Sequence, residues 1–180
     1  MAALAHTGAG HVTGFMQGVQ HPFTGIDHML AMVAVGLLAG RLGGRAMWLV
    51  PASFVSAVAV GAAFGMAGVA VPFVEIGIAA SIVVFGLMLA SGRDMTLPAT
   101  MVVVGCFALF HGHAHGTEAA GLGISIMAGM LIATAILHTF GVLLALAACR
   151  HRLEVASKPL LRWSGGLVAV AGVGVLAGWI

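Results

Sequence analysis

The stretch AGLGISIMAGMLIATAILHTFGVLLALAAC, residues 120–149, decides the fold class, because its 30 residues contain no Asp, Glu, Lys or Arg. A run of about 20 apolar residues is enough to cross a hydrocarbon core about 30 Å thick. The whole 180-residue chain is 61% hydrophobic and 7% charged, with a mean hydropathy of +1.15. Its apolar runs are continuous rather than alternating, which favours spanning helices over a β-barrel. The sequence therefore predicts an all-α, polytopic membrane protein.

Turn-forming residues divide the chain into about six predicted transmembrane helices within a single domain, residues 1–180. The predicted spans cover approximately residues 25–40, 46–67, 73–90, 97–113, 120–149 and 159–180. The helix-prone segment GFMQGVQ before His21 is a candidate extension of the first span. The 27 glycines allow helices to approach closely, and glycine-rich faces permit a homo-oligomer.

The basic residues all fall on one side of the predicted membrane bundle. They are Arg41, Arg45, Arg93, Arg150, Arg152, Lys158 and Arg162. The positive-inside rule makes that side cytoplasmic and places both termini outside. Ala3-Leu4-Ala5 resembles the end of a signal peptide, so we interpret residues 1–5 as its remnant or as an artificial start, with His6 as the mature N-terminus.

The stretch FHGHAHGTE, residues 110–118, gathers three histidines and a glutamate at the outer end of the fourth span. His111 and His115 are four residues apart and Glu118 follows three residues later, so a continuous helix places all three on one stripe. An i, i+4 histidine pair is a standard way to present two imidazoles to one metal ion. The alternative is a polar helix end that merely contacts water.

His113 points away from this stripe on a regular helix. Gly112 and Gly116 offer a second possibility, because a loosened helix end would let His113 join the other two histidines.

The stretch HPFTGIDH, residues 21–28, contributes two more histidines and an aspartate at the outer mouth of the first span. His21 and His28 are two helical turns apart, a rise of about 10 Å, so a straight helix cannot bring both to one ion. Pro22 and Gly25 provide a break that can fold His21 back towards Asp27 and His28. The alternative is a helix start with a polar cap.

Imidazole with carboxylate suits divalent Ni, Co, Zn or Cu, whereas Mg and Ca prefer oxygen ligands. Met29 and Met32 follow the aspartate–histidine pair and offer thioether contacts, although methionine in an apolar helix far more often packs in the core. The sequence contains no nucleic-acid-binding patch, so the predicted partners are membrane lipid and a transition-metal ion, with no nucleic acid.

Four further residues are candidates for metal binding or for an ion pathway. Glu75 lies near the outer end of the third span. It is a metal ligand, a partner that orients a histidine, or an interfacial residue, and these alternatives stay open. His138 lies well inside the fifth span, either as an inner stop for an ion or in an inter-helix hydrogen bond. His6 and His11 precede the first span and are candidates for an outer capture site.

Residues 21–28 follow the pattern HPxxGxDH and residues 110–118 the pattern FHGxAHGxE. Both patterns resemble the two signatures of the HupE/UreJ family of nickel/cobalt permeases. The resemblance also covers the number of spans and the processed N-terminus. Two long polar motifs in a chain of this size make the resemblance specific.

The resemblance implies a multi-pass protein of a bacterial inner membrane that takes up Ni²⁺, or Co²⁺ in some members. The metal typically supplies hydrogenase or urease. The resemblance also implies that six residues matter for transport: His21, Asp27, His28, His111, His115 and Glu118. His113 falls on a variable position of the motif. A permease is not an enzyme, but a metal-dependent intramembrane enzyme and a metal-binding sensor or accessory protein remain alternatives.

Overall fold

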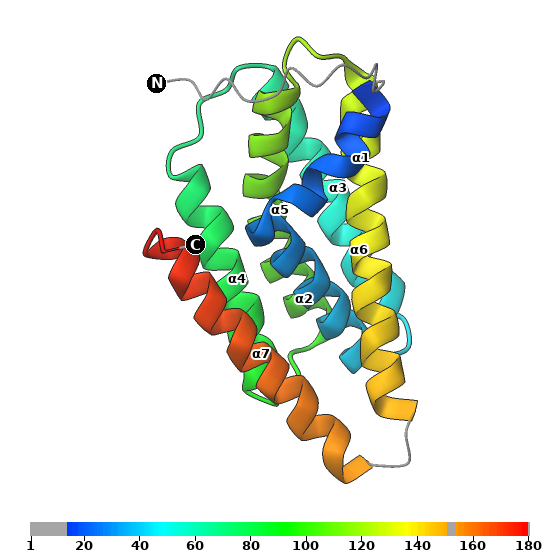
Figure 1. The fold of residues 1–180 in the computed structure, drawn as a ribbon. Coiled ribbons are helices and arrows are strands. Elements are labelled where there is room, and N and C mark those ends of the chain that lie inside the picture. The colour runs from blue at the N-terminus through cyan, green and yellow to red at the C-terminus, as the bar shows by residue number, and fades with distance from the viewer. Residues whose placement is uncertain (1–13, 151–153, 180) are drawn as a thin grey trace.

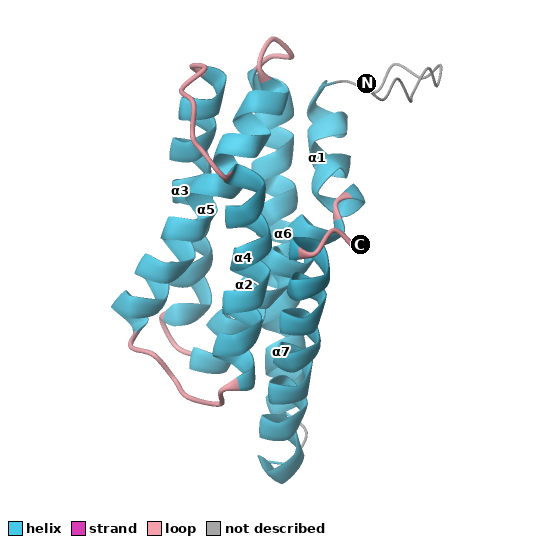
Figure 2. Ribbon diagram, turned by 90° about the vertical axis from the view of Figure 1, so that its left-hand side faces the viewer, coloured by secondary structure: helices cyan, strands magenta, loops and turns pink. Residues whose placement is uncertain are grey.

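The computed structural model describes residues 14–150 and 154–179, and this part of the chain is helical with no strand (Figure 1). Its helices are α1 (Gly14–Thr24), α2 (Ile26–Leu42), α3 (Ala46–Met66), α4 (Val74–Ala90), α5 (Leu97–Ala119), α6 (Ile124–Arg150) and α7 (Glu154–Leu176). From α2 to α6, the connections alternate between the two ends of the bundle (Figure 2). Helix α2 contacts each of the other helices and carries much of the buried core. The prediction of an all-α bundle is confirmed.

The apolar helices carry outward-facing apolar surfaces, as a membrane protein requires. Helices α3, α5, α6 and α7 are long and apolar enough to cross a membrane. Only 28 to 39% of the apolar window in each of these helices is buried within the protein. Large apolar side chains on the outer faces of these helices are exposed in the described bundle, among them Trp48, Val102, Leu143 and Val170. Lipid is the medium that fits such a surface.

The predicted first and third spans differ from these four helices. Helices α1 and α2 form one bent unit, with an angle of 81° between them, and α4 has 17 residues. The described chain thus holds four long candidate spans, or five if the bent pair is one span. The predicted count of six spans is reached only if the shorter helix α4 is counted as a span in addition to these five.

Glycines hold the helices close together at the most extensive helix–helix contacts. A methyl group on Gly61 or Gly65 of α3 would overlap the backbone of α5, and one on Gly112 or Gly116 would overlap the backbone of α3. The pairs α1–α6, α2–α6 and α4–α7 contain similar glycine contacts. Close backbone approach is the usual basis of helix association where lipid removes the hydrophobic driving force.

These contacts correct one alternative for the fourth span. The span was expected to end near His113, with Gly112 and Gly116 able to loosen the helix beyond it. Instead α5 continues to Ala119, because both glycines are packed against α3 and held in a regular helix. The turn that follows lies at Gly121 and Gly123, which both have positive φ.

Arginine side chains gather at the opposite end of the bundle from the α5–α6 turn. Arg41 donates to the carbonyl of Leu89 at 2.9 Å and pairs with Asp94 at 2.6 Å, and Arg162 donates to the carbonyl of Ala90 at 3.1 Å. These contacts satisfy the last carbonyls of α4 and place positive charge at its negative dipole end. We call this the arginine end.

Candidate metal centre

The break between α1 and α2 brings His21 back towards His28. Pro22 lies inside α1 and cannot donate a backbone hydrogen bond. Gly25 then adopts an extended conformation before α2 begins. A Cβ atom on Gly25 would lie 2.8 Å from Asp27 Oδ1, so glycine also leaves room for that carboxylate. As a result, the ring centroids of His21 and His28 lie 6.3 Å apart.

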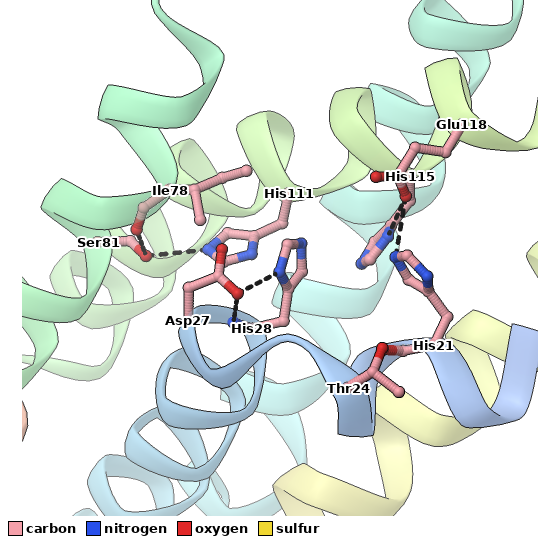
Figure 3. Close-up of polar contacts among 9 residues, drawn as sticks. All are labelled: His21, Thr24, Asp27, His28, Ile78, Ser81, His111, His115 and Glu118. Atoms are coloured by element: carbon pink, nitrogen blue, oxygen red, sulfur yellow. Dashed lines mark hydrogen bonds and ion pairs between the residues drawn. The ribbon is translucent and has the colours of Figure 1, made fainter. Parts of the chain in front are cut away.

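The bent pair faces the stripe of polar residues on α5 (Figure 3). We define the histidine cluster as His21, Asp27, His28, His111, His115 and Glu118. The ring centroid of His28 lies 5.0 Å from that of His111 and 4.5 Å from that of His115. The centroids of His21 and His115 are 5.3 Å apart. Four imidazoles from three helices thus meet in one place.

The cluster runs from an open rim into the protein interior. At the rim, His21 Nε2 lies 2.9 Å from Glu118 Oε2, and these side chains are 36% and 53% exposed. His28 is 12% exposed, whereas His111 and His115 are fully buried. Ligand atoms of His21, His115 and Glu118 all lie within 4.8 Å of one another, which suits a shared metal ion.

Asp27 fixes the orientation of His28. Its Oδ1 atom accepts hydrogen bonds from the backbone N–H of His28 at 2.8 Å and from His28 Nδ1 at 3.0 Å. A carboxylate only accepts, so Nδ1 carries a proton, and in the neutral ring Nε2 then has the free lone pair. Histidines that bind metals are commonly oriented by a carboxylate in this way.

Ser81 of α4 fixes the orientation of His111, and sequence reasoning missed it. The Ser81 hydroxyl donates its proton to the carbonyl of Ile78 at 2.6 Å. It therefore accepts from His111 Nε2, at 2.9 Å, and leaves Nδ1 of that ring as a free lone pair. A serine in the apolar part of α4 was the available signal, but its register against α5 was not visible in the sequence.

The buried side-chain nitrogen and oxygen atoms that lack a hydrogen-bond partner are confined to two places in the described bundle. His28 Nε2, His111 Nδ1 and both nitrogens of His115 belong to the cluster. The others are Thr134 Oγ1 and both ring nitrogens of His138. Buried polar groups are normally paired, so a concentration of free imidazole nitrogens indicates a site made for a ligand.

Other predicted site residues lie outside the cluster. His113 points away, and its Nε2 lies 2.7 Å from the carbonyl oxygen of Val69. Glu75 is exposed in the first turn of α4 and forms no ion pair with another described residue. Met32 is buried in the core and Met29 packs against it, which is the structural role expected of most helix methionines.

The remaining candidates are the deeper histidine and the N-terminal ones. His138 is buried on α6 with Phe54 of α3 against its ring. It has no hydrogen-bond partner in the described chain, so the expected alternative of a satisfied inter-helix bond is wrong. His6 and His11 lie outside the described residues.

Together, the fold and the cluster define a helical membrane protein with a histidine-rich polar site at one end. The chain matches the family described as HupE / UreJ protein over residues 1–175. It is 42% identical over 181 residues to Protein HupE of Rhizobium leguminosarum bv. viciae, covering 99% of this chain and 93% of that protein. The chain therefore belongs to the HupE/UreJ family, as the two signatures predicted. No solved structure matches it.

Proposed function

We propose that this protein is a permease for a divalent transition-metal ion, Ni²⁺ or also Co²⁺, in the bacterial inner membrane. One observation carries the proposal. The histidine cluster has an open rim formed by His21 and Glu118, and its buried part holds imidazole nitrogens without a hydrogen-bond partner. Membership of a family associated with nickel and cobalt uptake for hydrogenase or urease supports this choice of ion and of use.

The proposed topology has six spans, with the bent α1–α2 pair and α4 completing the four long helices. The arginine end faces the cytoplasm, in agreement with the positive-inside rule. The cluster then faces outward, and the N- and C-termini are both extracytoplasmic.

In the proposed mechanism, the rim captures a hydrated ion and the deeper imidazoles replace its waters. Glu118 and His21 offer the first ligands. His115 is close enough to bind the same ion, and because it is buried it also belongs to the inner part of the cluster. His28 and His111 present the ring nitrogens that do not contact Asp27 and Ser81, and these two contacts fix the orientation of the rings. Such a site must bind firmly enough to select an ion and weakly enough to release it.

Nickel entry into proteoliposomes tests this function, with His115→Ala as the informative variant and His113→Ala as its matched control on the same helix. We expect His115→Ala to lower Ni²⁺ flux at least tenfold, because it removes a buried ligand, and His113→Ala to retain most of the flux. Equal flux in both variants would contradict the assignment of His115. Nickel binding by the unmodified protein without any flux would instead favour a sensor or accessory role.

A further inference from the structure

Two polar side chains on α6 stand apart from the histidine cluster. Thr134 and His138 are four residues apart, so they lie one above the other on the same helix face. Their side chains are buried, at 0% and 1% exposure. Neither the Thr134 hydroxyl nor either ring nitrogen of His138 has a hydrogen-bond partner in the described bundle. We call these two residues the inner pair.

The Thr134 hydroxyl differs from other helical threonines of this protein. Thr100, Thr117 and Thr139 each donate to the carbonyl four residues earlier, at 3.1, 2.9 and 2.8 Å. That local bond is the usual way for a threonine to satisfy its hydroxyl inside an apolar helix. Because Thr134 does not make it, its oxygen is left available within the bundle.

His138 lies deeper than the cluster, along the direction of the arginine end, and Thr134 lies one helical turn before it on α6. A Cβ atom on Gly36 of α2 would overlap the backbone at His138, so these two residues lie at one level. Gly36 follows His28 by eight residues, which corresponds to about 12 Å along α2. The Phe54 ring contacts both sites, with its centroid 5.6 Å from that of His111 and 4.8 Å from that of His138.

Buried ionisable groups inside a membrane bundle are costly and usually line a substrate pathway. The His138 ring packs against Phe54, but neither its nitrogens nor the Thr134 hydroxyl forms a hydrogen bond that would offset the cost of burying them. Nitrogen is a good ligand for late transition metals, whereas a neutral hydroxyl is a weak one. Two such ligands hold an ion loosely, as a transient stop on a pathway requires.

We propose that Thr134 and His138 form a second, inner binding site for the divalent transition-metal ion after it leaves the histidine cluster. This inference rests on the proposed permease function and adds a relay to it. His138 supplies a ring nitrogen, Thr134 supplies its hydroxyl oxygen, and the rest of the coordination is left to water or backbone carbonyls. Phe54 contacts a histidine of each site, so the ion passes beside its ring in moving from one to the other.

The test compares His138→Leu and Thr134→Val with Thr139→Val, a control on the same helix whose hydroxyl has its local partner. Purified variants are assayed for Ni²⁺ binding, for Ni²⁺ flux in proteoliposomes and for thermal unfolding. We expect at least tenfold lower flux in His138→Leu, severalfold lower flux in Thr134→Val and unchanged flux in the control. Nickel affinity at the cluster should stay within about twofold, because the inner pair lies outside it.

Thermal unfolding separates a relay from a structural role. Replacing an unpaired buried polar group by an apolar one of similar shape should leave the melting temperature unchanged or raise it. Unchanged flux in His138→Leu would overturn the proposal. So would lower flux accompanied by lost nickel binding or a lower melting temperature in both variants. Absence of flux in the unmodified protein would refute the permease itself, which distinguishes that failure from a failure of the inner site.

Discussion

Ser81→Ala is the sharpest perturbation of the histidine cluster, because it removes no proposed ligand. Ser81 and His111 are both fully buried, and the serine oxygen is the acceptor for the Nε2 proton at 2.9 Å. Without this acceptor, the ring either buries an unpaired N–H or moves its proton to Nδ1. The second choice blocks the nitrogen that we propose as a metal ligand.

The size of the effect follows from that single hydrogen bond. Leaving a buried donor unsatisfied costs about 1–3 kcal/mol, and every 1.4 kcal/mol corresponds to about tenfold in affinity. Loss of a residue that orients a metal-binding histidine typically weakens binding by about 10–100-fold. We therefore expect nickel binding by Ser81→Ala to be about 10–100-fold weaker.

Calorimetric nickel titration of the purified protein measures this change. Ser53→Ala is the matched control, because Ser53 makes the same local bond, to the carbonyl of Val50 at 2.7 Å, without touching a histidine. The control should bind nickel like the unmodified protein. An affinity of Ser81→Ala within twofold of that of Ser53→Ala would refute the reasoning.

Three further substitutions test the second orienting contact and the helix packing. Asp27→Asn keeps an acceptor for His28 but removes its charge, so nickel affinity should fall about tenfold, and an unchanged titration would contradict this role. Gly116→Ala places a methyl group against the backbone of Ala62, so the free energy of unfolding should fall by about 1–3 kcal/mol. Gly105→Ala on the same helix meets its nearest atom at 4.0 Å and should stabilise by up to about 1 kcal/mol, since alanine favours helix. Thermal unfolding in detergent compares the two glycine variants, and a loss of similar size in both would argue against the close α3–α5 approach.

Much of the fold was predictable because hydropathy, helical periodicity and turn residues act locally. The breaks between the long helices followed from turn residues. Sequence spacing offered the break at Gly25 and the common stripe of His111, His115 and Glu118 as one of two alternatives each, and the structure decided for both. The end of α5 was misjudged, since Gly112 and Gly116 look like helix breakers until their contact with α3 is known.

The sequence alone determined that the chain is helical and apolar, that it carries two polar motifs, and that imidazole and carboxylate groups dominate them. Only the tertiary structure decided which of those groups meet, because the angle at Gly25 and the glycine contacts between distant helices set the register of α2, α4 and α5. That register brings Ser81 to His111 and leaves His138 without a partner. A hydrogen bond depends on distances of a few tenths of an ångström between helices far apart in the chain, and local sequence patterns carry no such information.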